Sequence, residues 1–217
     1  MDLPERTPAD GVVGACWQCE AAVAVQVALC VACGVVQPPL EGLGPFARLG
    51  LEPNARLTTA DVAARRLELL DQLHPDRFAA HSPIAGQHAQ TLAIAINDAA
   101  RALRDPLDRL AEIFRLRGIE PEPVAPTRAF FTVLQEFQAA LIELRGVDAH
   151  AERDRLGREV AHRFQATQDA LAIGLETPDF PAVLARQALG ELMALRGLLD
   201  QLEALDTTPD RLGRRRT

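Results

Sequence analysis

The spacing of the apolar residues restricts the fold of this chain more than any other feature. From Pro45 onward they recur three or four positions apart, and almost no stretch alternates as a strand would. This pattern predicts a mostly α-helical protein. Capping residues, prolines and glycines interrupt the apolar stripes and place the expected helices near residues 46–49, 59–73, 84–104, 106–117, 130–144, 148–173 and 181–205.

The four cysteines all lie before this helical region. Cys16 and Cys19 form one C-x-x-C pair, and Cys30 and Cys33 form a second. Residues 23–29, between the pairs, alternate as in a strand. Two such pairs can supply four thiolates to one tetrahedral zinc ion. We therefore predict a small zinc knuckle with a structural metal, because four protein ligands leave no open coordination position.

Other uses of the four cysteines stay open as alternatives. An iron–sulfur cluster needs the same number of thiolates. Disulfides are rare in a reducing compartment, and a thioredoxin-like redox site needs a βαβ pattern that the sequence lacks. A segment this short has no adequate core, so metal binding would supply most of its folding free energy, ~10–16 kcal/mol in comparable peptides.

Charge and hydropathy exclude several classes of protein. The 23 cationic residues are all arginine and stand against 30 acidic residues, which gives a formal charge of −7. This balance argues against a nucleic-acid-binding surface, and only the arginine-rich end of the chain leaves that alternative open. No apolar run is long enough for a membrane span, and no signal-like segment follows the N-terminus. We expect a soluble, cytoplasmic protein, and the arginine-rich composition suggests a bacterial one.

The turn between the second and third expected helices carries His74, Pro75 and Asp76. A His-Pro-Asp tripeptide between two antiparallel amphipathic helices resembles the signature of J-domain proteins. Residues 96–109, with Ile-Asn-Asp-Ala followed by Asp-Pro and an arginine, resemble a second J-domain signature.

The remaining helices make the resemblance narrower. A J-domain followed by a short linker and a three-helix bundle is similar to the HscB family, the J-domain co-chaperones of iron–sulfur cluster biogenesis. The tetracysteine segment resembles the extension of eukaryotic and some bacterial members. The expected domains are the zinc-knuckle extension with its linker at 1–44, a J-domain (an antiparallel helical hairpin plus two short helices) at 45–118, a linker at 119–126, the three-helix bundle at 127–206 and a tail at 207–217.

The resemblance implies a co-chaperone and not an enzyme. HscB proteins stimulate the ATPase of a DnaK- or HscA-type chaperone through the J-domain and deliver the iron–sulfur scaffold protein IscU through the bundle. The implied chaperone-binding residues are His74, Pro75, Asp76, Arg65, Arg66 and Arg77. Pro75 stiffens the loop, so little entropy is lost on binding, and Asp76 can accept a charge-assisted hydrogen bond from a chaperone arginine.

These residues also have structural alternatives. His74 can be an ordinary loop residue and Asp76 a cap of the following helix, while Arg65 and Arg66 can be solvated surface. The second helix departs from the usually basic family pattern, because its three acidic residues outnumber its two arginines.

The scaffold-binding face of HscB proteins lies on the first helix of the bundle. Matching the register places it at Phe131, Thr132, Gln135, Glu136, Ala139 and Glu143, of which Phe131, Gln135, Glu136 and Glu143 are the expected scaffold-binding residues. These positions lie off the apolar stripe, so we expect them to be exposed. Phe131 as an edge of the core is the alternative.

Two other functions are weighed against this one. The chain can be a J-domain protein of another specificity, whose bundle and knuckle bind a different client. An enzyme would need a site such as a metal held by His81, His88 and Asp76. However, the sequence has no H-E-x-x-H, G-x-S-x-G, P-loop or G-x-G-x-x-G motif.

Overall fold

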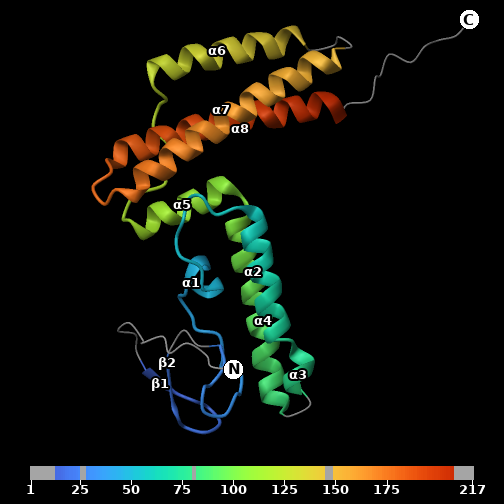
Figure 1. Cartoon of the computed structure of the whole chain (residues 1–217), viewed down its shortest axis with the longest axis vertical. Coiled ribbons are helices and arrows are strands. Elements are labelled where there is room, and N and C mark those ends of the chain that lie inside the picture. Colours follow the sequence, from blue (N-terminus) through green and yellow to red (C-terminus); the bar gives the residue numbers. More distant parts are fainter. Residues whose placement is uncertain (1–12, 25–27, 80–81, 145–148, 208–217) are drawn as a thin grey trace, which may run out of the picture. The chain divides into compact units, whose positions relative to one another are not determined.

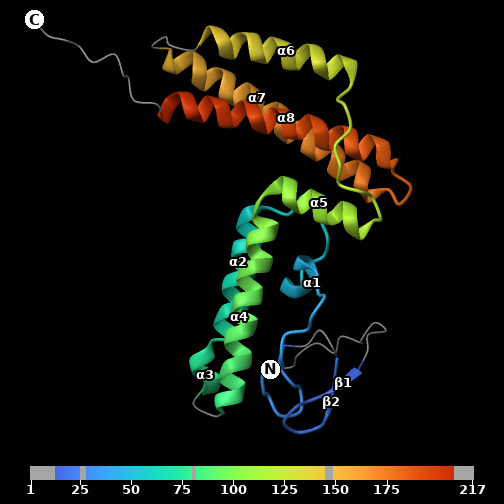
Figure 2. The same cartoon turned by 180° about the vertical axis from the view of Figure 1, so that it is seen from behind.

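The computed structural model describes residues 13–24, 28–79, 82–144 and 149–207. Their elements, labelled in Figure 1 and seen from behind in Figure 2, are β1 (Val13–Ala15), β2 (Ala22–Ala24), α1 (Pro45–Leu49), α2 (Thr59–Gln72), α3 (Pro75–Ala79), α4 (Pro83–Arg104), α5 (Pro106–Leu116), α6 (Arg128–Glu143), α7 (His150–Glu176) and α8 (Ala182–Thr207). The predicted mostly α fold class is confirmed. Among these helices, none is both long and apolar enough to cross a membrane. The arginine-rich tail lies outside the described residues.

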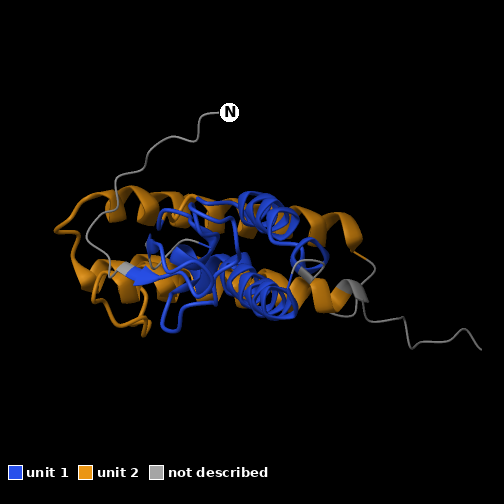
Figure 3. Ribbon diagram, turned by 90° about the horizontal axis from the view of Figure 1, so that it is seen from below, with its two compact units in different colours: residues 1–53, 57–109 blue, residues 54–56, 110–217 orange. Residues whose placement is uncertain are grey.

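The chain divides into two compact units, coloured separately in Figure 3. Unit 1 comprises residues 1–53 and 57–109, and unit 2 comprises residues 54–56 and 110–217. The cysteine segment and helices α1 to α4 therefore belong to one compact body.

In the cysteine segment, strand β1 pairs antiparallel with β2, with Gly14 opposite Val23. An isolated bridge joins Leu29 to Val36. The strand expected over residues 23–29 is thus found only at its start, in β2, while residues 25–27 lie outside the described part. Each C-x-x-C pair occupies the turn between two short extended segments.

Helices α2 and α4 form the predicted antiparallel hairpin and run side by side in both views (Figure 1, Figure 2). Helix α2 begins with a capping box, because Thr58 and Asp61 each accept a hydrogen bond from the other's backbone N–H. Arg66 Nη1 donates to Asn97 Oδ1 over 2.8 Å and links the two helices. The buried face of α4 consists of Ala85, Ala89, Leu92, Ile96, Ala99, Ala100 and Leu103.

The turn between α2 and α4 contains a helix that the sequence analysis missed. Helix α2 ends at Gln72, and the five-residue helix α3 starts at Pro75. Proline suits the first position of a helix, since its missing N–H has no intrahelical partner there. Two of the three signature residues, Pro75 and Asp76, therefore belong to α3.

The second J-domain signature supports the fold at the junction of α4 and α5. Asp105 Oδ1 accepts a hydrogen bond of 2.7 Å from the Leu107 N–H and so caps α5. Arg109, only 2% exposed, donates to the Leu103 carbonyl over 2.6 Å at the end of α4. Burial lowers the pKa of Arg109, while the charges of Asp105 and Asp61 oppose this shift.

In unit 2, α7 and α8 run side by side in both views, and α6 packs against both (Figure 1, Figure 2). Phe130, Phe137 and Leu141 of α6 are buried, as the apolar stripe predicts. The buried face of α7 consists of Arg153, Leu156, Val160, Phe164, Gln168, Leu171, Ala172 and Leu175.

The predicted linker before α6 is fixed against α8. The Val124 N–H donates to the Arg186 carbonyl over 3.3 Å, and Arg186 Nε donates to the Glu122 carbonyl over 2.7 Å. A Cβ atom at Gly190 would lie 2.5 Å from the Val124 carbonyl oxygen. Glycine at this position therefore permits the close approach of the linker to the helix.

Candidate functional site

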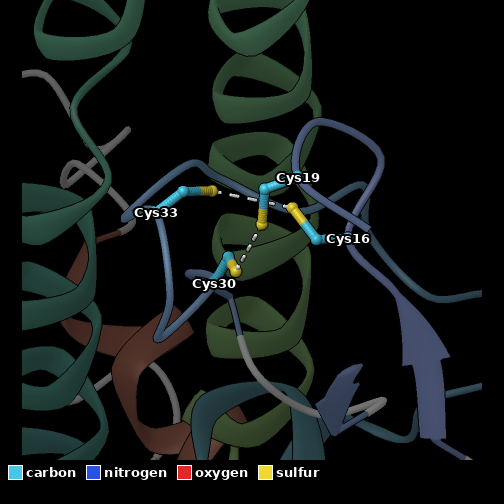
Figure 4. Close-up of side chains that lie close together, drawn as sticks. All are labelled: Cys16, Cys19, Cys30 and Cys33. Carbon is cyan, nitrogen blue, oxygen red and sulfur yellow. Dashed lines mark hydrogen bonds between the residues drawn. The ribbon is translucent and has the colours of Figure 1, made fainter. Parts of the chain in front are cut away.

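The four cysteine thiols lie close together, as Figure 4 shows. The sulfur atoms all lie within 4.8 Å of one another. Cys16 Sγ is 3.7 Å from Cys33 Sγ, and Cys19 Sγ is 3.7 Å from Cys30 Sγ, so each close pair joins one C-x-x-C to the other. The predicted tetracysteine cluster is confirmed.

This geometry fits a tetrahedral metal better than disulfides. Zinc–sulfur bonds of about 2.3 Å place neighbouring thiolates of a tetrahedral site about 3.8 Å apart. A disulfide requires about 2.05 Å between sulfurs. All four cysteines are free, and they are the only cluster of potential metal ligands in the described part of the chain. They can hold one metal ion, consistent with zinc.

The two C-x-x-C turns have the same backbone hydrogen bonds. The Cys16 N–H donates to the Ala21 carbonyl, and the Glu20 N–H donates back to the Cys16 carbonyl. The second turn repeats this pattern from the Cys30 N–H to the Val35 carbonyl and from the Gly34 N–H to the Cys30 carbonyl. Each turn therefore directs its two sulfurs to the same side.

The thiols differ in acidity. Burial opposes ionisation of Cys16, but hydrogen bonds from the Cys19 and Gln18 backbones and the Gln37 side chain outweigh it and lower its pKa to about 6. At Cys33 the Val35 backbone favours the thiolate, but burial and the three neighbouring thiols raise its pKa to about 12. A cation among the four sulfurs would offset this mutual repulsion, since metals bind the thiolate form.

Two residues that sequence reasoning missed support the cluster. Gln37 is buried and donates from Nε2 to Cys16 Sγ over 3.3 Å and to the Val35 carbonyl over 3.1 Å. Trp17 Nε1 donates to the Val36 carbonyl over 2.7 Å and so links the first C-x-x-C turn to the extended segment that follows the second turn. Trp17 lies inside the first C-x-x-C motif, which gave a signal for it, whereas no sequence signal marks Gln37.

The His-Pro-Asp corner is presented outward at the junction of α2 and α3. The side chains of His74 and Asp76 are 57% and 91% exposed. The Asp76 N–H donates to His74 Nδ1 over 3.3 Å, and that nitrogen lies 3.7 Å from Asp76 Oδ2. The His74 imidazole thus accepts a hydrogen bond from a backbone N–H in the first turn of α3. In the alternative considered above, Asp76 would instead be the residue that caps a helix.

The three arginines predicted beside the corner are held differently. Arg65 is half-buried, donating from Nε to the Leu49 carbonyl over 2.8 Å and pairing with Glu68 at 2.7 Å. Arg66 is also half-buried and bonds Asn97 across the hairpin, as described above. Arg77 is exposed and lies 3.8 Å from Asp71. Only Arg77 adjoins the corner directly in the sequence.

The predicted face of α6 is exposed. Phe131, Thr132, Gln135, Glu136, Ala139 and Glu143 all lie on the surface. Phe131 is 52% exposed, so it does not belong to the buried core. Ile142, 64% exposed and 11 positions further along, adds a second apolar side chain that the sequence analysis did not include.

The metal site considered for an enzyme receives no support. His81 lies outside the described residues. His88 packs its ring against Trp17, with ring centroids 5.4 Å apart, and Asp76 lies at the corner. Neither residue belongs to the cluster of potential ligands found in the described chain, which consists of the cysteines alone.

Comparison with known proteins gives the family. No family model matches the chain. The co-chaperone protein HscB homolog of Cupriavidus taiwanensis is 32% identical over 172 residues, which cover 76% of this chain and 95% of that relative. The crystal structure of human co-chaperone protein HscB gives a TM-score of 0.69 at 20% identity and covers 89% of this chain and 99% of that one. Chaperone HscB from Vibrio cholerae gives 0.59 at 23% identity, over 76% and 98% of the two chains. The structural matches show the fold, and the Cupriavidus relative shows that the chain belongs to the HscB family of co-chaperones.

Proposed function

We propose that this protein is a co-chaperone that stimulates the ATPase of a DnaK- or HscA-type chaperone through its His-Pro-Asp corner. The observation that carries the proposal is the exposure of His74 and Asp76 at the end of a packed helical hairpin. Pro75 fixes the corner, so binding costs little entropy. The Asp76 carboxylate can accept a charge-assisted hydrogen bond from a chaperone arginine.

Arginines near the corner would assist the encounter with an acidic chaperone surface. Arg77 is the best placed, since it follows Asp76 and is exposed. Arg65 and Arg66 contribute their charge, but their bonds to Leu49 and Asn97 give them a structural role as well. We therefore expect their replacement to affect helix packing together with chaperone binding.

Single-turnover ATP hydrolysis by the chaperone, with and without this protein, tests the proposal. The wild-type chain should accelerate hydrolysis severalfold, and Asp76→Asn should abolish the acceleration while leaving helicity intact. Asp108→Asn is the matched control, because Asp108 is an exposed aspartate in the first turn of α5, away from the corner. No acceleration by the wild type with any of the host's DnaK-type chaperones would refute the proposed function.

For the bundle, we propose that the exposed face of α6 binds an IscU-type iron–sulfur scaffold and delivers it to the chaperone. Phe131, Gln135, Glu136 and Glu143 are the proposed contacts, and Ile142 extends their apolar part. An exposed aromatic side chain beside acids can anchor a partner through a few strong contacts.

The tetracysteine knuckle would hold structural zinc, in the reducing cytoplasm of a bacterium.

Binding of the scaffold is measured by titrating IscU against the purified chain. Phe131→Ala should weaken binding about tenfold or more if Phe131 is an anchor. Ile173→Ala is the control, since Ile173 is an equally exposed apolar residue on α7. Active ATPase stimulation combined with no binding of IscU would favour the alternative, a J-domain protein whose bundle and knuckle serve a different client.

A further inference from the structure

One pocket of unit 1 is built jointly by the knuckle and the His-Pro-Asp corner. It has a volume of about 500 Å³. The knuckle contributes Trp17, Gln18 and Val35 to its lining. The opposite side comes from Arg77 and Phe78 of α3 together with the first turn of α4. Both sides lie in unit 1, so the pocket lies within one compact body.

The knuckle is fastened to the helical hairpin beside this pocket. The ring of Trp17 meets the ring of His88 edge to face, with centroids 5.4 Å apart and an angle of 68° between their planes. Such aromatic pairs contribute more free energy to a contact than the burial of their surface area alone would give. After the knuckle, Arg48 Nη2 of α1 donates to the Leu40 carbonyl over 2.9 Å and holds the connecting segment.

Two residues that line the pocket come directly after the His-Pro-Asp corner in the sequence. Arg77 and Phe78 follow Asp76 directly in α3. Both residues lie within one helical turn of Asp76, so a partner large enough to cover the corner can also reach the pocket beside it. Trp17 and Phe78 supply apolar walls, and Arg77, whose guanidinium also lies 3.8 Å from Asp71, supplies positive charge. This combination suits an apolar side chain next to a carboxylate.

We propose that the knuckle and the His-Pro-Asp corner form one composite docking surface for the DnaK-type chaperone, which places an apolar side chain flanked by an acid in this pocket. This inference rests on the proposed function, because it concerns the same partner at the same corner. It assigns the knuckle a direct part in chaperone binding in addition to its metal.

The two C-x-x-C turns offer a matched pair of variants. Gln18 lines the pocket, whereas Ala32, at the same position of the second turn, is exposed and does not line it. In single-turnover assays, Gln18→Phe should raise the concentration for half-maximal stimulation by about fivefold or more, as expected when an interface pocket is filled. Ala32→Phe should change it less than about twofold. Metal content of both variants reports whether the knuckle stays folded.

A binding signal from Trp17 gives a second readout that needs no variant of the pocket. Trp17 is the only tryptophan of the chain, so labelling with 5-fluorotryptophan gives one ¹⁹F resonance. Addition of unlabelled chaperone with ATP should shift or broaden it, and Asp76→Asn should prevent this. Stimulation by the wild type without any ¹⁹F change, and with equal effects of the two variants, would overturn the composite surface and leave the proposed function standing. Absence of stimulation by the wild type would refute both.

Discussion

The knuckle and the C-terminal bundle are stabilised by different interactions. The described part of the knuckle buries few side chains, namely Cys16, Val23, Cys30, Val35, Val36 and Gln37. The bundle buries continuous apolar stripes on three helices, each of 16 residues or more. Apolar burial can hold helices of that length together, whereas a segment as small as the knuckle needs a metal ion or disulfides to be stable. The comparison predicts that the knuckle depends on a metal ion held by its four cysteines, where the bundle depends on its apolar core.

Removal of the metal should have the largest effect and should be confined to the knuckle. Metal binding is worth ~10–16 kcal/mol in comparable zinc peptides, far more than the few buried side chains of the knuckle can supply. A strong chelator should therefore unfold the knuckle while the helical ellipticity stays nearly constant. Emission from Trp17 should shift to the red, and it is a clean reporter because the chain has one tryptophan and no tyrosine.

Metal analysis and a visible spectrum of the purified protein complete this experiment. One zinc per chain without visible absorption supports the structural site, whereas absorption in the visible range indicates an iron–sulfur cluster. An unchanged Trp17 emission after complete loss of metal would contradict the idea that the metal stabilises the knuckle.

A cavity in the bundle core should have the next largest effect, and it should leave the knuckle intact. Leu192 of α8 is fully buried, at 0% exposure, whereas its neighbour Met193 is 47% exposed. Leu192→Ala should lower the free energy of unfolding by about 2–5 kcal/mol, and Met193→Ala by less than about 0.5 kcal/mol. Urea unfolding followed by circular dichroism measures both. A loss of metal from Leu192→Ala would show that the two regions are not independently stabilised.

Much of this contrast follows from the sequence, because both regions have local patterns. The cysteine spacing predicts the cluster of four thiols, and the apolar periodicity predicts α6 to α8. Helix α3 was missed because five residues are too few to show periodicity, although proline followed by an acid is a typical start of a helix.

Contacts between distant segments could not be predicted in this way. Trp17 and His88 lie 71 positions apart, and only the packing of the knuckle on α4 brings their rings together. Gln37 reaches Cys16 Sγ across 21 positions because the cysteine segment folds back on itself. The pocket is lined by residues of the knuckle, of α3 and of the start of α4, so the sequence predicts the candidate site only as two separate parts.

The cap of α2 should show a smaller effect that depends on pH. Thr58 Oγ1 accepts from the Asp61 N–H over 3.1 Å, and Asp61 Oδ2 accepts from the Thr58 N–H over 2.8 Å. Thr58→Ala should cost about 0.5–2 kcal/mol of stability at pH 7. Thr91→Ala is the control, because Thr91 is an exposed threonine inside α4 that bonds only back to the Gln87 carbonyl.

The pH dependence of this cap follows from the carboxyl of Asp61. Hydrogen bonds from the side chain and backbone of Thr58 lower the pKa of Asp61. A carboxyl with a lowered pKa stabilises the fold above its unfolded pKa of about 3.9, and this contribution is lost as the pH falls through the folded value. The difference between wild type and Thr58→Ala should therefore be complete at pH 7 and shrink below about pH 4. An equal difference at pH 7 and pH 3 would exclude the reciprocal cap.

The smallest effect we expect compares the two turns of the knuckle with each other. Gly34 follows the second C-x-x-C with φ +72°, and Glu20 follows the first with φ +61°. A left-handed backbone costs a non-glycine residue about 1 kcal/mol, so Glu20→Gly should tighten metal binding by about fivefold. Gly34→Ala should weaken it by a similar factor through backbone strain, since no atom lies within 4 Å of the added Cβ. Competition with a chelator of known affinity measures both. Affinity changes of opposite sign, at unchanged stability of the bundle, would show that backbone strain in the turns and metal binding act on the same folding equilibrium. Equal metal affinities of the two variants and the wild type would show that the turns adjust without strain.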